Sequence, residues 1–275
     1  MSFDDGGAGS ADARVNDADP NAPDANVSDA RISGNTHSMD FLPGADHYLN
    51  VPDQAGTLGL DPVDTMTVEA WINIHLLPAT QQRYAVVVKA DINTDEKSYG
   101  FEFKNNGGTP LMEARVEGTD STGNALDSVG WVWADFEVGT WYHVAFTYDI
   151  APAAVIDRFK FYVNGVENTN ASLLQGGGIT SIRDSIAPVT IGSRISTKGN
   201  MQNQFDGKID EVRIWARART QPAIAGSFEM QLEGGEEDLL GYWPLNNSLT
   251  DATTRGNNAT IVGDPAPEFV TDTPF

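Results

Sequence analysis

Short segments in which apolar and polar residues alternate run through most of this sequence. They are separated by turns rich in Gly, Asn, Asp and Pro. A period of two with turns at close spacing is typical of β-strands that bury one face. The expected strands cover residues 38–42, 47–51, 66–74, 83–90, 98–104, 109–117, 130–136, 141–149, 158–167, 187–194, 207–216, 238–245 and 259–264.

Two features of this pattern indicate how the strands are arranged. The sequence NNGG at residues 105–108 joins two of the expected strands and is a signal for a tight hairpin. Only residues 220–233 have a helical pattern, and this segment is short. The chain therefore lacks the alternating helices of a parallel sheet, and the pattern predicts an antiparallel sandwich or barrel.

An aspartate interrupts the alternation at the start of the strand expected at residues 207–216. By strict alternation Asp210 shares one strand face with Val212 and Ile214, whereas Glu211 and Arg213 lie on the other. The apolar pair indicates the buried face, so Asp210 is expected to point inward. A buried carboxylate needs a partner. The sequence itself offers backbone amides or a basic side chain, such as Lys208 or an arginine.

Composition narrows the classes of partner. The 275 residues carry 39 acidic and 17 basic side chains, which gives a formal net charge of −22. Such a charge disfavours nucleic acid and anionic membranes as partners and suits divalent cations. The chain has no cysteine and therefore no disulfide framework or thiolate site. It also has no apolar run long enough for a transmembrane helix, which excludes insertion by a helix into a membrane.

Residues 1–37 differ in composition from the rest of the chain. They are rich in Asp, Ala, Gly, Asn and Pro and have almost no large apolar side chain. We predict a disordered acidic linker or tether here, because such a segment buries too little apolar surface to fold. The beginning of the chain lacks the apolar stretch of a signal peptide, so either export is absent or its signal is missing from this chain.

Several segments, taken in order, resemble the laminin-G-like jelly-roll domains of the concanavalin A-like lectin and glucanase superfamily. They are MTVEAWINI, WYHVAFTYD, FKFYVNGV, APVTIGSR, FDGKIDEVRIWARA and GYWPL. The resemblance covers about residues 38–264. It implies an all-β domain over residues 38–275, a jelly-roll sandwich of two antiparallel sheets, with a short C-terminal tail after about residue 264. It also implies several functional classes, because the fold hosts lectins, enzymes and inert spacers.

The resemblance also suggests a partner for Asp210. In related jelly rolls an aspartate at this position binds a structural calcium ion together with the opening strand. The candidates in that region are Asp40, Asp46 and the carbonyl group of Gly44, because calcium prefers oxygen ligands. Leu42 and Pro43 stand where the family has a small Asp-Gly turn, so the opening-strand ligands are less well specified than Asp210.

No catalytic motif stands out in the sequence. Glu113 and Glu117 share a face with Arg115 between them, and we interpret that face as a solvated strand surface with an ion pair. Trp131 and Trp133 lie outside the family motifs, on one strand face after a polar loop. They form either a stacking platform for sugars or a half-buried strand face.

These observations predict a non-catalytic carbohydrate-binding or adhesion module of an extracellular or cell-surface bacterial protein, stabilised by calcium. The predicted partner is a glycan or polysaccharide. Two alternatives remain: a structural spacer with no glycan ligand, and a glycan-active enzyme with an atypical site.

Overall fold

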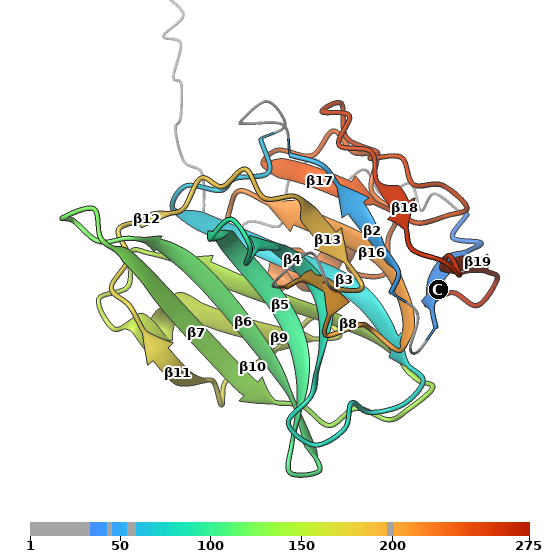
Figure 1. The fold of residues 1–275 in the computed structure, drawn as a ribbon, viewed down its shortest axis with the longest axis horizontal. Helices are drawn as coiled ribbons and strands as arrows, with labels where there is room; N and C mark the ends of the chain where they lie inside the picture. Colours follow the sequence, from blue (N-terminus) through green and yellow to red (C-terminus); the bar gives the residue numbers. More distant parts are fainter. Residues whose placement is uncertain (1–33, 43–45, 54–58, 197–200) are drawn as a thin grey trace, which may run out of the picture.

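Two antiparallel β-sheets packed face to face form the protein (Figure 1). This is the sandwich that the family resemblance implies, and one of the two architectures that the alternation predicts. The computed structural model describes residues 34–42, 46–53, 59–196 and 201–275. The predicted tether up to residue 33 lies outside the described residues. So does Gly44, the predicted carbonyl ligand.

We call the smaller sheet sheet A. Its strands, in spatial order, are β10 (Val166–Asn168), β9 (Phe159–Val163), β8 (Trp141–Asp149), β3 (Thr65–Ile74), β16 (Gly207–Trp215), β1 (Ser38–Phe41) and β19 (Glu268–Val270), and β17 (Leu239–Trp243) also pairs with β16. A short helix, α1 (Gln221–Ser227), follows β16. Thr220 caps it, since its side chain accepts a hydrogen bond from the backbone amide of Ala223.

Sheet B is the larger sheet. Its strands, in spatial order, are β11 (Ser172–Gly176), β7 (Ala125–Trp133), β6 (Thr109–Thr119), β5 (Glu96–Asn106), β4 (Arg83–Asp91), β13 (Val189–Ile191), β2 (Tyr48–Val51) and β18 (Thr260–Val262). The short strands β12 (Ser181–Ile182) on β6, β14 (Arg194–Ile195) on β4 and β15 (Met201–Gln202) on β14 complete it. The hairpin predicted at residues 105–108 is confirmed, because Asn106 pairs with Thr109 between β5 and β6.

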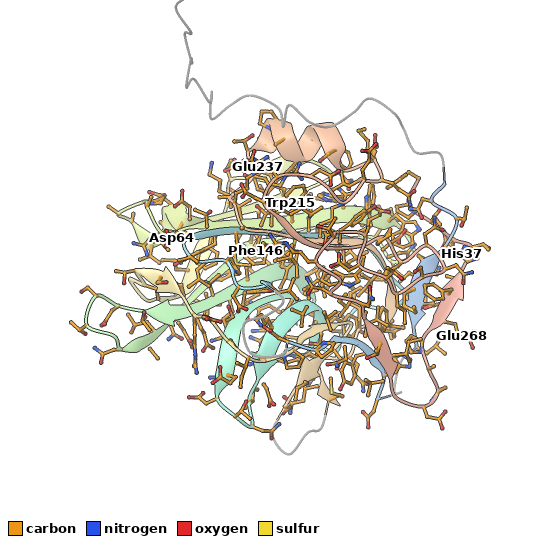
Figure 2. All side chains as sticks on the ribbon, turned by 90° about the horizontal axis from the view of Figure 1, so that it is seen from above. His37, Asp64, Phe146, Trp215, Glu237 and Glu268 are labelled. Carbon is orange, nitrogen blue, oxygen red and sulfur yellow. The ribbon has the colours of Figure 1, made fainter. Side chains whose placement is uncertain are left out.

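Apolar side chains fill the space between the sheets. Phe101 of β5 packs on Phe146 of β8, with ring centroids 5.2 Å apart, and both rings are buried. In Figure 2, α1 lies outside sheet A and Phe146 lies in the middle of the molecule. A one-turn 3₁₀ helix, η1 (Val155–Arg158), joins β8 to β9. No helix in the described ranges is long and apolar enough to cross a membrane.

The two ends of the described chain are more tightly attached than the sequence suggests. Asn35 donates a hydrogen bond to Asp210, and Thr36 bonds Asn246, although both precede the expected start of the domain at residue 38. The segment after residue 264 was expected to be a tail. It instead contributes β19, which pairs with β1.

Candidate functional site

The face of sheet B that points away from the core carries a row of charged side chains. In β5 the core receives Tyr99, Phe101 and Phe103, so the alternate residues, including Glu102, face outward. Neighbouring β6 places Glu113, Arg115 and Glu117 on the same side by the same alternation, because Met112, Ala114 and Val116 enter the core. We call this surface the outer face of sheet B.

Eight charged side chains of this face form ion pairs with one another. Arg83 of β4 contacts Glu113 with nitrogen–oxygen distances of 3.1–3.2 Å and lies 3.6 Å from Glu102. Arg115 binds Asp127 of β7 at 2.8 Å. The remaining pairs are Lys97–Glu117 at 3.7 Å and Arg194–Glu102 at 4.0 Å. Four basic and four acidic side chains thus cancel in formal charge, on a molecule that is otherwise strongly acidic.

The row corrects our interpretation of Glu113 and Glu117. They do share a face with Arg115 between them, but only 4% of Glu113 and 7% of Glu117 is exposed, so the face is not a solvated one. Arg115 pairs with neither of them. Their partners are Arg83 for Glu113 and Lys97 for Glu117, which lie in other strands, so alternation within one strand gives no sign of them.

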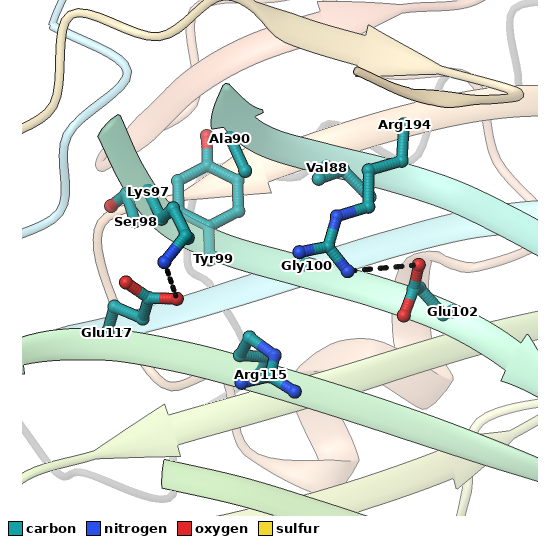
Figure 3. A pocket seen from close by; sticks show the side chains of 10 residues that line it. All are labelled: Val88, Ala90, Lys97, Ser98, Tyr99, Gly100, Glu102, Arg115, Glu117 and Arg194. Carbon is teal, nitrogen blue, oxygen red and sulfur yellow. Dashed lines mark ion pairs between the residues drawn. The ribbon is translucent and has the colours of Figure 1, made fainter. Parts of the chain in front are cut away.

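A hollow lies within this row (Figure 3). Small side chains form its base: Val88 and Ala90 of β4 and Ser98 and Gly100 of β5. The ion pairs Lys97–Glu117 and Arg194–Glu102 stand on either side, as the dashed lines in Figure 3 show. The hollow is small: its volume is about 10 Å³, which is room for about one water molecule. It therefore adds polar groups to the face and does not enclose a ligand.

One carboxyl group in this hollow has an unusual affinity for its proton. Burial raises the pKa of Glu117 to about 7, and the neighbouring Asp127 carboxylate, opposite it on β7, adds to the effect. The ammonium group of Lys97 opposes both but does not outweigh them. The charge of the hollow therefore changes near neutral pH.

Trp131 and Trp133 lie at one end of the same face. Their ring centroids are 5.0 Å apart and their planes meet at 81°, so one ring presents its edge to the other. Trp133 is 40% exposed and Trp131 is half-buried. The predicted pair is therefore in contact, as a corner of two rings rather than a flat platform. A sugar ring stacked on one indole would have the other beside it.

Strand register joins the tryptophans to the charged row. Trp131 stands directly opposite Glu113 in the β6–β7 pair, and side chains at opposed positions on one face are neighbours. On its other side Trp131 faces Ser172 of β11. The aromatic corner, Glu113 with Arg83, and the hollow thus follow one another across the outer face of sheet B.

Asp210 lies elsewhere, in sheet A. It is completely buried, as expected, but it does not share a face with Val212. A β-bulge sets Glu211 and Val212 together against a single residue of β3, and Glu211 adopts a left-handed φ of 52°. The core therefore receives Ile209, Val212 and Ile214, and Asp210 points to the other side of the sheet.

The immediate partners of Asp210 are neutral. Its carboxylate accepts hydrogen bonds from the side-chain amide of Asn35 at 2.9 Å and from the backbone amide of Glu211 at 3.0 Å. Burial and the neighbouring Glu211 carboxylate raise the pKa of Asp210 well above its ordinary value. The Oδ1 atom of Asn35 is buried without a hydrogen-bond partner, so two oxygen-bearing side chains meet here.

The other predicted calcium ligands have different surroundings. Asp40 lies 3.7 Å from His75, and Asp46 accepts a hydrogen bond from Gln204 at 2.7 Å. Within residues 34–42, 46–53, 59–196 and 201–275, no three His, Asp or Glu side chains form a group suited to a metal ion. The calcium site stays a prediction, with Asn35 as a neighbour of Asp210 that the sequence did not indicate.

The outward side of β16 beyond Asp210 is covered by α1 and the segment after it. Arg219 binds Glu69 at 2.7 Å, and Arg213 binds Glu211 at 2.8 Å, all of them buried. Arg213 also donates to the carbonyl of Ser227, at the end of α1. These charges hold the helix on the sheet, and we assign them a structural role.

Comparison with solved structures supports this architecture. A candidate carbohydrate-binding protein from Bacteroides ovatus superposes with a TM-score of 0.55 at 24% identity, over 85% of this chain and 61% of that one. The present chain thus spans about 61% of the length of that protein. A heptameric SAP-like pentraxin from Limulus polyphemus superposes with a TM-score of 0.56 at 15% identity, over 87% of this chain and 97% of that one. At these identities the likeness shows the fold.

A search of curated proteins gave no significant match. A family model does match, over residues 43–225, which is more than half of the chain. Its description agrees with the resemblance carried by the sequence segments and with the two-sheet sandwich. The chain therefore belongs to the Laminin_G_3 family of the concanavalin A-like lectin/glucanases superfamily.

Proposed function

We propose that the protein is a non-catalytic carbohydrate-binding module and that its glycan lies across the outer face of sheet B. The observation that carries the proposal is the register of Trp131 against Glu113, which joins an exposed aromatic corner to a continuous polar row. Sugars need both an aromatic surface for their apolar faces and planar polar groups for their hydroxyls. The carbohydrate-binding description of the Bacteroides ovatus protein agrees with this assignment.

The ion pairs indicate the kind of glycan. Four basic and four acidic side chains of the row are joined in ion pairs within the face. A charged sugar would have to displace one of these pairs, whereas hydroxyl groups can bond to their free edges. We therefore propose a neutral glycan, bound by a module that acts outside the cytoplasm or at a cell surface in adhesion.

The test is a glycan array followed by titration with the best neutral ligand. Trp131→Ala combined with Trp133→Ala should weaken binding at least tenfold, about 1.4 kcal/mol. Trp141→Ala removes a half-buried tryptophan from sheet A and serves as the matched control, with binding unchanged. Unaltered binding by the double variant would overturn the assignment of the face, and a wild-type protein silent on the array would favour a spacer.

A second function has one observation in its favour. Glu117 and Asp127 are opposed carboxyl groups, and Glu117 holds its proton up to about pH 7, as the general acid of a glycosidase must. The pairing of both groups with Lys97 and Arg115 argues for binding instead. Release of reducing sugar from a bound glycan, lost in Glu117→Gln, would establish the enzyme.

Structural calcium is a separate proposal, centred on Asp210. Its support is the buried carboxylate beside Glu211 and the unpartnered oxygen of Asn35. An ion bound only by the folded protein adds about 2.7 kcal/mol at a hundredfold excess over its Kd. Chelation should lower the Tm of the wild type but not that of Asp210→Asn. Asp40→Asn and Asp46→Asn then show whether the opening segment takes part, and a Tm insensitive to chelator and to added calcium would contradict the proposal.

A further inference from the structure

A lysine side chain is buried between the two sheets. Lys89 of β4 stands opposite Tyr99 of β5 and Val189 of β13, and both of those side chains belong to the core. Opposed residues of neighbouring strands share a face, so the Lys89 side chain points inward, and none of it is exposed. Lysine is almost never fully buried unless it is paired. The ammonium group of Lys89 therefore depends on the acceptors around it.

Two carboxyl groups and one carbonyl surround the Lys89 ammonium. Its Nζ atom donates to the carboxylate of Asp53, whose side chain is also fully buried, and to the carbonyl of Ala187 at 2.9 Å. Asp61 Oδ1 lies 3.3 Å from the same nitrogen and accepts a hydrogen bond from the backbone amide of Ser185 at 3.1 Å. The lysine is thus held against one carboxyl group, with a second carboxyl group beside it.

We propose that Lys89 and Asp53 become joined by a covalent amide, an intramolecular isopeptide bond, and that Asp61 moves the protons of this reaction. The fold holds the amine and the carboxyl group in contact, which makes their reaction effectively unimolecular. Burial favours the product, because an ion pair is costly in the protein interior, whereas an amide carries no charge.

The reaction is a condensation that neither oxidises nor reduces any group. Protonated Asp61 gives its proton to the Asp53 carboxylate and takes one from the Lys89 ammonium. The free amine attacks Cγ of Asp53, so that the Nζ–Cγ bond forms and one Cγ–O bond breaks. Asp61 protonates the departing hydroxyl group and receives the second amine proton. One water molecule leaves, Nζ keeps one hydrogen, and Asp61 ends in its initial protonated form.

The surroundings of Asp61 suit this role. Burial raises its pKa to about 6 although the Lys89 ammonium opposes the shift, and the Asp53 carboxyl group adds to it. A group that exchanges its proton near neutral pH can act as both acid and base. Asp61 also lines a surface hollow of about 320 Å³, which gives the released water a way out.

The bond would tie together two parts of sheet B. It joins positions that are 36 residues apart, the segment after β2 and the strand β4, and the loop that it closes contains β3 of sheet A. A covalent link of this kind restricts the unfolded chain and thereby stabilises the fold. The link would also persist under conditions that break ion pairs, which makes it detectable in the denatured protein.

Mass spectrometry of the full chain tests the bond. The wild type should be lighter than its sequence by one water molecule, about 18 Da. Trypsin should not cut after Lys89, and the peptide that contains Lys89 should be joined to the one that contains Asp53. Lys97 is the internal control, because its partner Asp95, at 2.9 Å, is 83% exposed. This solvated pair should stay ionic, and trypsin should cut after Lys97.

Three variants distinguish the bond from an ordinary ion pair. Lys89→Arg keeps the positive charge but forms no such amide, so its mass should equal that of its sequence. Asp61→Asn keeps an acceptor for the Ser185 amide but does not transfer protons. It should be isolated mainly without the bond, because such transfer contributes about 10²–10⁴ in rate. Asp53→Asn should lose ammonia in place of water and give a product with the mass of the linked wild type.

Two results would overturn the proposal. One is a folded wild type that keeps the mass of its sequence after incubation at neutral pH. The other is a loss of water at a different position, such as a cyclised aspartate, which would leave Lys89 open to trypsin. Circular dichroism shows which variants are folded. If Lys89→Arg or Asp61→Asn does not fold, the joined peptides of the wild type still decide.

Discussion

At the scale of single residues, the raised pKa of Glu117 makes the stability of the protein depend on pH near neutrality. Its pKa is about 7 in the folded protein against an ordinary 4.5. The folded state therefore binds the proton more tightly than the unfolded state. The resulting stabilisation is complete below about pH 4.5 and is lost as the pH rises through about 7.

Relative to the wild type, the variant Glu117→Gln should consequently be more stable at pH 8 than it is at pH 5. Glutamine stays neutral at every pH, so the difference between variant and wild type grows as the wild-type carboxyl ionises. We expect a difference on the order of 1 kcal/mol, since each pH unit over which only the folded state keeps this proton contributes about 1.4 kcal/mol. Thermal unfolding at several pH values measures it, with the exposed Glu137→Gln as control for the loss of one charge. A constant difference across this range would contradict the shifted pKa.

Asp210 shows how far single positions are predictable. Its burial was predicted correctly, although the prediction rested on a face shared with Val212 and Ile214 that the structure does not show. The side of sheet A to which Asp210 points was predicted wrongly, because strict alternation holds only in a strand without a β-bulge. One left-handed residue, Glu211, inserts an extra position. Glutamate rarely adopts a left-handed conformation, and the residue types around position 211 do not indicate one.

At the scale of elements, the start of β16 depends on a close backbone contact. A Cβ atom on Gly207 would lie 2.2 Å from the carbonyl oxygen of Asn73 in β3, and its φ of 149° is unfavourable for other residues. Gly207→Ala should therefore force the β3–β16 pair apart and destabilise the protein by about 2–4 kcal/mol.

Chemical denaturation measures this effect, with Gly226→Ala as the control. Gly226 lies within α1, and a Cβ atom there would meet no atom within 4 Å. Alanine favours helix over glycine by up to about 1 kcal/mol, so this variant should be neutral or more stable. Equal destabilisation by both changes would show that the contact at Asn73 is not what limits the substitution.

The strongly alternating strands were predictable, and the ends of elements were less so. β7 begins at Ala125, inside a stretch that its polar residues had marked as a loop. Pairing with β6 extends the strand there, from Thr119 opposite Ala125 onward. The expected helix at residues 220–233 ends at Ser227, because contacts with sheet A rather than helix propensity decide its length.

For the whole molecule, the two-sheet sandwich followed from alternation and from the family segments, but the candidate site did not. Its tryptophans were indicated by their shared strand face. Its charged row depends on pairs such as Arg194–Glu102, which join distant parts of the chain. No local sequence pattern predicts such a pair, since it forms only because β14 pairs with β4 in the folded protein.

The pairing of β1 with β19 also determines how the domain bears mechanical load. Ser38 stands opposite Val270, so a pull through the two ends opens this pair from one end, one hydrogen bond after another. The Lys208–Asp272 ion pair at 2.6 Å and the Trp141–Asp272 bond at 3.1 Å lie beyond Val270 and carry the force first.

In an optical trap we expect an early, low-force extension before the sandwich ruptures, and a lower force still in Asp272→Ala. A single rupture without that step would contradict this. Under tension the domain would then lengthen slightly at its joined ends while the outer face of sheet B stays intact.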